Sequence, residues 1–302
     1  MSTKLQKFVI LGGYGQIGSC LTKQLSKLGH EVTCLGRGEC TAGNEREAYI
    51  SGVLTEADVV VHAAGSGDQS FAEQCAVHVE LSKWVLPLCI DHKVKQFIYL
   101  SSVRALTGYA SKNPVTHHEV ASPHGHYGMA KLQAERWLLE QKEKFVRHQL
   151  RVQILRLPMV YGPGMTSNLD QLISLLNKKV PIPVSYHNRR SLLLNLNLAE
   201  FVNKLTQVES TQSVFHVQDG PAISTGELIT GLSSASGKKG ITVPIPNRLR
   251  GVLLAQPLGK SLWERMLGCL EMSTEPCFQL AEYSPSYTTK QGLERTYGIQ
   301  VR

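Results

Sequence analysis

The stretch Leu11-Gly12-Gly13-Tyr14-Gly15-Gln16-Ile17-Gly18 decides how this chain folds. It follows an apolar run at residues 8–11 and precedes apolar residues that recur at helical spacing. Glycines at positions 12, 15 and 18 permit a tight turn, the approach of a pyrophosphate to the backbone, and close packing of a helix on a strand. The N–H groups of the following helix terminus favour an anion. The stretch therefore predicts a dinucleotide-binding loop in a first β-α-β unit.

Short apolar runs alternate with amphipathic segments up to about residue 165. The strand candidates are residues 8–11, 32–35, 59–62, 97–100 and 152–157. Several are apolar at consecutive positions, as expected for strands that are covered on both faces. This rhythm predicts an α/β fold with a Rossmann-type doubly wound parallel sheet.

The alternation of apolar runs and amphipathic segments ends after Leu157, where prolines and glycines interrupt it. We therefore expect a dinucleotide-binding domain over residues 1–165 and a smaller substrate-binding lobe over residues 166–302. Residues 197–219 are expected to return to the first domain. Ser224 and Glu227 have the spacing of a capping box that opens a helix.

Composition and charge exclude several classes of protein. The chain has 302 residues and a formal net charge of +8, but its basic pairs are dispersed, so we expect no nucleic-acid partner and a surface that attracts a doubly anionic small substrate. Seven cysteines without a CxxC pair predict neither a disulfide framework nor a metal site. Neither a signal peptide nor an apolar run of membrane-spanning length is evident, so we expect a cytoplasmic protein with no membrane partner.

Tyr127-Gly128-Met129-Ala130-Lys131 places a phenol and an ammonium one helical turn apart. A nearby positive charge favours the phenolate, which makes Tyr127 a usable proton donor and acceptor. Ser102 follows the predicted strand at residues 97–100, at the carboxyl edge of the sheet where ligands bind. We therefore predict that Tyr127, Lys131 and Ser102 are catalytic.

Gly36-Arg37 ends the second predicted strand, where the choice between the two nicotinamide dinucleotides is made. A carboxylate there would hold the ribose of NAD(H), whereas a guanidinium can pair with the 2′-phosphate of NADP(H). The sequence thus favours NADP(H), with NAD(H) as the alternative.

Together these segments resemble the extended short-chain dehydrogenase/reductase family. The resemblance also covers Val61-His62-Ala63-Ala64, Leu155-Arg156-Leu157-Pro158-Met159-Val160-Tyr161-Gly162-Pro163-Gly164 and Asn188-Arg189-Arg190-Ser191. Within the family, the chain is most similar to nucleotide-sugar 4-epimerases and 4-ketoreductases. The resemblance implies a homodimer, with Trp84, Leu88, Leu132 and Trp137 as apolar material for its helical interface.

The same resemblance assigns residues to the two ligands. The cofactor-binding set is Gly12, Tyr14, Gly15, Gln16, Ile17, Gly18, Arg37, Ala63, Ala64, Tyr127, Lys131, Pro158 and Val160. The residues expected to contact the nucleotide-sugar substrate are Arg104, Asn168 and Arg190.

Departures from the family pattern leave the reaction open. The stretch at residues 37–59 is short, and His78 stands where relatives carry a structural Asn, which we interpret as a packing replacement. An NADPH-dependent 4-ketoreductase is the first hypothesis, because Arg37 suits NADPH. A UDP-sugar 4-epimerase with tightly bound NAD is the second, and a non-catalytic redox sensor that binds NADP(H) is the third. Other sugar or small-carbonyl reductions also remain open.

Overall fold

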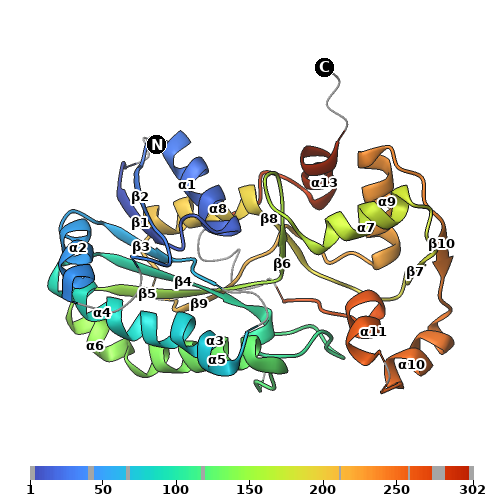
Figure 1. Cartoon of the computed structure of the whole chain (residues 1–302), viewed down its shortest axis with the longest axis horizontal. Coiled ribbons are helices and arrows are strands. Elements are labelled where there is room, and N and C mark those ends of the chain that lie inside the picture. The colour runs from blue at the N-terminus through green and yellow to red at the C-terminus, as the bar shows by residue number, and fades with distance from the viewer. Residues whose placement is uncertain are drawn as a thin grey trace.

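The computed structural model describes residues 4–39, 44–65, 69–116, 120–210, 212–257, 259–273 and 283–298 (Figure 1). In the first half of the chain, strands alternate with helices. The elements are β1 (Lys7–Leu11), α1 (Gln16–Lys27), β2 (Glu31–Leu35), α2 (Asn44–Leu54), β3 (Val59–His62), α3 (Phe71–Cys75), the π-helical turn η1 (Ala76–Glu80), α4 (Leu81–Asp91), β4 (Gln96–Ser102), the 3-10 turn η2 (Val103–Ala105), α5 (Gly125–Glu140), α6 (Lys142–Arg147) and β5 (Arg151–Leu157). Each strand predicted from the sequence lies within one of these strands.

A parallel six-stranded sheet forms the centre of the fold, in the order β2-β1-β3-β4-β5-β9. Helices cover both faces, because alternate residues of each strand are apolar on opposite sides. Phe8 and Ile10 pack with α1 and α8, whereas Val9 and Leu11 pack with α2, α4, α5 and α6 (Figure 1). The predicted doubly wound Rossmann-type sheet is confirmed.

The second half of the chain builds a lobe beside the sheet (Figure 1). Its elements, together with two that return to the sheet, are β6 (Met159–Tyr161), α7 (Asn168–Asn177), β7 (Ile182–Val184), β8 (Leu192–Leu194), α8 (Asn195–Gln207), β9 (Val214–His216), α9 (Thr225–Ser236), β10 (Thr242–Pro244), α10 (Asn247–Ala255), α11 (Lys260–Leu267) and α13 (Thr289–Tyr297). α7, α9 and α13 share a core of their own. β9 pairs with β5, and α8 packs on the same face of the sheet as α1. The domain boundary near residue 165 stays a prediction.

Ser224 and Glu227 form the capping box that their spacing predicts. The Ser224 hydroxyl accepts from the Glu227 backbone N–H at 3.1 Å, and the Ser224 N–H donates to the Glu227 carboxylate at 2.7 Å. α9 therefore begins where the sequence indicates.

Two further expectations concern a dimer interface and membrane-spanning helices. Trp84 and Leu88 on α4, and Leu132 and Trp137 on α5, are partly buried within the protomer, and the homodimer stays a prediction. None of the helices in the described ranges combines the length and the apolar character needed to cross a bilayer.

Candidate active site

The glycine-rich loop lies between β1 and α1 and is shaped by close backbone contacts. Gly12 has φ +79°, and a Cβ on it would lie 2.5 Å from the Ala64 Cα. A Cβ on Gly18 would lie 2.2 Å from the Gly12 carbonyl oxygen, so helix and loop pack as the sequence predicts. Gly15 caps α1 without a side-chain hydrogen bond, which leaves N–H groups of the first turn for an anion.

A cavity of about 700 Å³ opens over this loop. Its lining residues are Gly12, Tyr14, Gly15, Gln16, Ile17, Gly36, Arg37, Ala63, Ala64, Gly65, Ala76, Val77, Glu80, Leu81, Trp84 and Tyr127. The structure thus brings most of the expected cofactor-binding residues together around one space. The side chains from η1 and α4 were missed, because the sequence carries no motif that turns those helices toward the loop.

Tyr127, Lys131 and Ser102 meet beside this cavity. Tyr127 and Lys131 lie one turn apart in α5, and Ser102 is the last residue of β4. The Lys131 Nζ lies 5.8 Å from the centroid of the Tyr127 ring and donates to the Leu100 carbonyl oxygen at 2.6 Å. The Ser102 hydroxyl donates to the Leu157 carbonyl oxygen at 3.4 Å and lies close enough to Tyr127 to act on its pKa. A reacting oxygen can therefore meet both hydroxyls at once.

Burial raises the pKa of Tyr127, while the Ser102 hydrogen bond and the Arg104 charge act in the opposite direction. We expected Lys131 to lower the pKa of Tyr127, but here the lowering comes from Ser102 and Arg104. Burial lowers the pKa of Lys131 itself to about 7, against the attraction of Glu135. The phenol is thus protonated at neutral pH and can act as an acid.

The ionisation of Lys131 predicts how stability changes with pH. Its pKa is about 7 in the folded protein and 10.5 in its ordinary state, so between these values the unfolded chain binds a proton that the folded chain does not. The contribution of Lys131 to the free energy of unfolding therefore rises with pH across this window. Below about pH 7 the cost of burying the charged ammonium destabilises the folded protein in full. Urea unfolding from about pH 7 to about pH 10 should show a steeper rise in the wild type than in Lys131→Met. Equal slopes would contradict the lowered pKa.

A buried ion pair lies one turn beyond Lys131. The Glu135 carboxylate accepts from Arg156 Nη2 at 2.6 Å and from Arg156 Nε at 3.0 and 3.1 Å, and it also accepts from the Ser101 hydroxyl. The two charged side chains are only 1% and 7% exposed. The pair joins α5 to β5 and fixes the helix that carries Tyr127.

His78 is fully buried in η1, and its ring is edge-on to the Tyr127 ring at 5.7 Å between centroids. Burial lowers its pKa, followed by the charges of Lys131 and His62, so the imidazole is neutral. Neither ring nitrogen has a hydrogen-bond partner among the described residues. This position agrees with the interpretation of His78 as a packing residue, here against the Tyr127 ring.

The end of β2 carries groups of both charges. Arg37 is exposed and lines the cavity, and its charge helps to lower the pKa of Glu73, which the Ser70 hydrogen bonds lower more. Glu39 was not singled out in the sequence, yet its carboxylate accepts from the Gly36 N–H at 2.9 Å. A carboxylate therefore does lie at the end of this strand, supplied by a residue three positions later.

The three residues expected to contact substrate lie in different surroundings. Arg104 in η2 donates to the His124 carbonyl oxygen at 3.0 Å and lies near Tyr127. Asn168 is exposed at the first turn of α7. The Arg190 guanidinium donates to the carbonyl oxygens of Tyr109, Glu264 and Gly268, so it holds the end of α11 against the loop after η2. Arg104 and Arg190 thus both contact Tyr109, and the contacts of all three residues with substrate stay predictions.

Pro158 and Val160 follow β5 and lie outside the lining of the cofactor cavity. Pro158 is buried and Val160 packs against the core under α1 and α8. Their contact with a cofactor stays a prediction.

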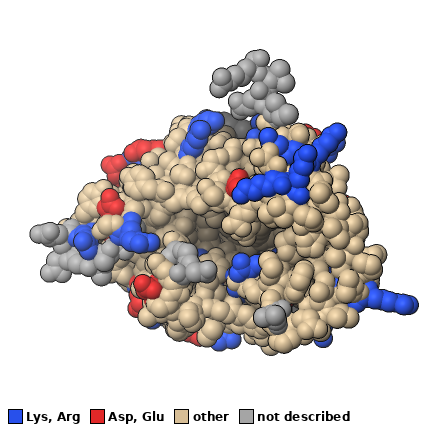
Figure 2. Space-filling view, turned by 45° about the vertical axis from the view of Figure 1, so that its right-hand side comes forward, with Lys and Arg blue, Asp and Glu red and all other residues tan. Residues whose placement is uncertain are grey.

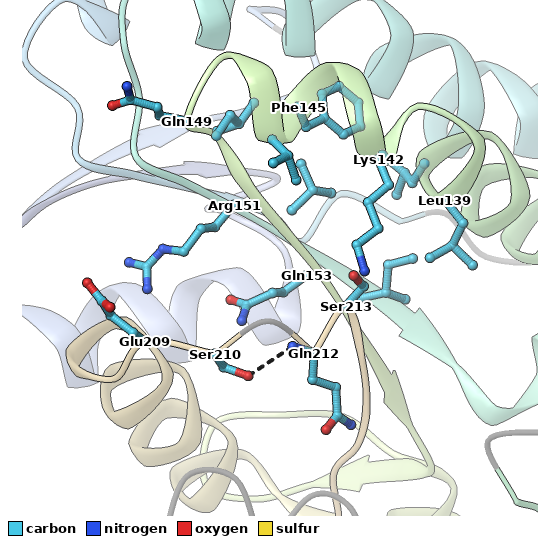
Figure 3. A pocket seen from close by; sticks show the side chains of 15 residues that line it. Leu139, Lys142, Phe145, Gln149, Arg151, Gln153, Glu209, Ser210, Gln212 and Ser213 are labelled. Atoms are coloured by element: carbon cyan, nitrogen blue, oxygen red, sulfur yellow. Dashed lines mark hydrogen bonds between the residues drawn. The ribbon is translucent and has the colours of Figure 1, made fainter.

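A second cavity, of about 730 Å³, lies at the amino ends of β5 and β9 (Figure 3). Leu139, Phe145, Arg151, Gln153 and Glu209 are among the residues that line it. None of the predicted site residues does so. Figure 2 shows a different face of the molecule, which is hollowed at its centre and has Lys and Arg side chains around the hollow.

The resemblance seen in the sequence is confirmed by known proteins. Residues 8–212 match the model of the NAD dependent epimerase/dehydratase family. The chain is 28% identical to a UDP-glucose 4-epimerase of Vibrio cholerae, over 97% of this chain and 95% of that protein.

Solved structures share the fold. A UDP-N-acetylglucosamine 4-epimerase from Bacillus cereus superposes with a TM-score of 0.75 at 18% identity, covering 96% of this chain and 97% of that one. MoeE5 in complex with UDP-glucuronic acid and NAD gives a TM-score of 0.72 at 17% identity, with the same coverage of 96% and 97%.

Proposed function

Because the chain belongs to the NAD dependent epimerase/dehydratase family, we propose that it is a UDP-sugar 4-epimerase with bound NAD. The observation that carries this proposal is that Tyr127, Ser102 and Lys131 lie close together beside a cavity lined by the glycine-rich loop. The full-length similarity to a UDP-glucose 4-epimerase supports the sugar substrate and the position of the reaction.

The glycine loop packs as closely as a dinucleotide-binding loop requires. A Cβ on Gly12 would collide with the Ala64 backbone, and a Cβ on Gly18 with the Gly12 carbonyl, so the loop approaches its neighbours as closely as a pyrophosphate cradle requires. The residues that would hold the dinucleotide are the loop, the first turn of α1, and the ends of β2 and β3. A bound nicotinamide would supply the hydride acceptor and donor for C4 of the sugar.

The chain's own residues manage the proton at the C4 oxygen. To take the proton as C4 becomes a ketone, Tyr127 must first ionise to the phenolate, a form that burial opposes and that the Ser102 hydrogen bond and the Arg104 charge favour. The resulting phenol gives the proton back when the alcohol forms again. Ser102 orients the same oxygen by a hydrogen bond, and Lys131 contributes positive charge beneath the tyrosine ring. If the hydride came back to the opposite face of C4, that centre would be inverted with no net redox change.

In this proposal the Glu39 carboxylate on the Gly36 N–H favours NAD over NADP. Glu39 itself does not line the cavity, whereas Arg37, on which the preference for NADP(H) rests, does. A 2′-phosphate at the end of β2 would meet the negative charge that sits on the Gly36 N–H, whereas the ribose hydroxyls of NAD could donate to it. Fluorescence titration should show NADH bound more tightly than NADPH. Losing a hydrogen bond to a charged group costs about 1.5–3 kcal/mol, so Glu39→Gln should weaken NADH binding about tenfold or more and relieve the discrimination against NADPH.

Arg37→Met is the matched control for this prediction, because Arg37 lies beside the same strand end but offers the opposite charge. It should leave the affinity for NADH nearly unchanged. A wild-type protein that prefers NADPH, and loses that preference in Arg37→Met, would restore the interpretation taken from the sequence.

A 4-ketoreductase is the second candidate, favoured by the position of Arg37 on the cavity wall, where it could pair with a 2′-phosphate. A net reduction would draw on exchangeable NADPH. The non-catalytic sensor is the weakest alternative, because the chain retains a proton donor with its orienting hydroxyl.

Two assays separate these functions. The purified protein is incubated with UDP-glucose, UDP-N-acetylglucosamine and UDP-glucuronate without added cofactor, and C4 epimers are resolved chromatographically. In parallel, NADPH oxidation is followed with UDP-4-keto-sugars. Epimers formed without added cofactor support the proposal. NADPH oxidation without epimerisation would show that the protein is a 4-ketoreductase. A protein that binds a dinucleotide but shows neither activity would support the sensor.

A further inference from the structure

Tyr109, in the loop after η2, lies between two guanidinium groups. The Arg104 Cζ lies 3.8 Å from the centroid of its ring and the Arg265 Cζ lies 3.9 Å from it. Two planar groups cannot share one face at these distances, so they stack on opposite faces. Arg265 also donates to the Tyr109 hydroxyl. Arg104 follows β4 and Arg265 belongs to α11, so the stack joins the sheet to the second lobe.

The stack is positively charged and lacks an anion. Within the ranges that the structure describes, neither Arg104 nor Arg265 forms an ion pair, and the Arg104 Nε is buried without a hydrogen-bond partner. The charges also lower the pKa of Tyr109, against the effect of its burial. Arg265 is exposed and Arg104 also donates to the His124 carbonyl oxygen, so the Arg104 Nε is the donor that has lost water without gaining a partner. The planar fork of a guanidinium is suited to a carboxylate or a phosphate.

The backbone keeps this stack in place. The Tyr109 carbonyl oxygen accepts from the Arg190 guanidinium, which also binds the carbonyl oxygens of Glu264 and Gly268 at the end of α11. Arg190 therefore fixes the loop and the helix that carry the stacked groups. The cluster is held by tertiary contacts from both lobes.

Arg104 is near the reacting centre. Its Cζ lies 5.9 Å from the centroid of the Tyr127 ring, and its charge acts to lower the pKa of the Tyr127 hydroxyl, which burial raises. In a hexose, C6 is attached to the carbon next to C4, whereas the diphosphate is attached across the ring at C1. An anionic group near Arg104 is therefore better placed on C6 than on C1.

We propose that Arg104, Tyr109 and Arg265 form a subsite for a carboxylate on the sugar ring, so that the substrate class is a UDP-hexuronate. The proposal rests on the proposed function for the placement of C4 at Tyr127. Arg104 pairs with the carboxylate, while Tyr109 and Arg265 hold the Arg104 guanidinium and add positive charge.

The test is the equilibrium binding of UDP-glucuronate, UDP-glucose and UDP to the full chain by calorimetry. The wild type should bind UDP-glucuronate about tenfold or more tightly than UDP-glucose, as expected for one charge-assisted contact. Arg104→Met should abolish that difference and leave UDP binding unchanged, and Arg104→Lys should retain part of it. Arg265→Met should reduce the difference, and the reduction should shrink at high salt.

Arg295→Met is the matched control, because Arg295 also stacks on a tyrosine, with its Cζ 4.3 Å from the Tyr287 ring centroid. It should change none of the three affinities. Equal wild-type affinities for UDP-glucuronate and UDP-glucose would overturn the proposal. An Arg104→Met variant whose affinity for UDP falls as much as its affinity for UDP-glucuronate would also overturn it, since Arg104 would then bind the diphosphate. If UDP-glucuronate binds through Arg104 but no C4 epimer forms, the subsite stands and the proposed function fails.

Discussion

Tyr127→Phe should lower kcat by about 10²–10⁴-fold, the range that general acid–base catalysis contributes. The substitution keeps the ring, which packs edge-on against His78, and removes only the hydroxyl that we propose exchanges the proton. Substrate binding should change little, because the lost interaction matters most in the transition state. Initial rates of C4 epimerisation over a range of substrate concentrations measure both quantities.

Lys131→Met separates the role of the lysine from that of the tyrosine. It removes the positive charge beneath the Tyr127 ring and should reduce kcat together with cofactor affinity, whereas Tyr127→Phe should leave cofactor affinity intact. A Tyr127→Phe enzyme with full turnover would show that another group moves the proton.

Glu135→Gln should destabilise the protein by about 3–5 kcal/mol, the cost of leaving one buried charge without its partner. The substitution keeps the size of the side chain but leaves the Arg156 guanidinium facing a neutral amide in a place that is nearly inaccessible to water. Urea unfolding followed by circular dichroism measures the change. Because Glu135 raises the pKa of Lys131, the variant should also hold that lysine neutral at a lower pH.

Two controls make this prediction specific. Replacing both partners, as Glu135→Leu with Arg156→Leu, removes both buried charges and should recover much of the lost stability. Glu143→Gln breaks an exposed pair, in which Arg147 Nη2 lies 3.7 Å from the carboxylate, and should have little measurable effect. A double variant less stable than Glu135→Gln would contradict the account of a buried charge left unpaired.

Local patterns in the sequence predicted the sheet and the loop that positions the site. Strands buried on both faces are apolar at successive residues, and the glycine loop must follow the first of them, so both features can be recognised within short segments. The capping box at Ser224 and Glu227 is equally local. Tyr127 and Lys131 lie in the same helix, so their relative position follows from helical geometry alone.

Side chains whose partners come from distant segments could not be predicted in this way. Arg190 donates to carbonyl oxygens of the loop after η2 and the end of α11, contacts that no local pattern indicates, while its contact with the substrate stays a prediction. Glu39 escaped notice because its turn back to the Gly36 N–H depends on the conformation after β2. The stacking of Arg104 and Arg265 on Tyr109 likewise requires the two lobes to meet.

The central claim is C4 epimerisation of a UDP-sugar through the Tyr127 hydroxyl with a bound dinucleotide. The most direct measurement is chromatographic analysis of UDP-glucuronate and UDP-glucose after incubation with the purified wild type and with Tyr127→Phe, without added cofactor. The account predicts a mixture of C4 epimers with the wild type and almost none with Tyr127→Phe, although both proteins hold the dinucleotide. A dinucleotide-bound wild type that forms no C4 epimer of either sugar, or a Tyr127→Phe variant that forms it as fast as the wild type, would contradict it.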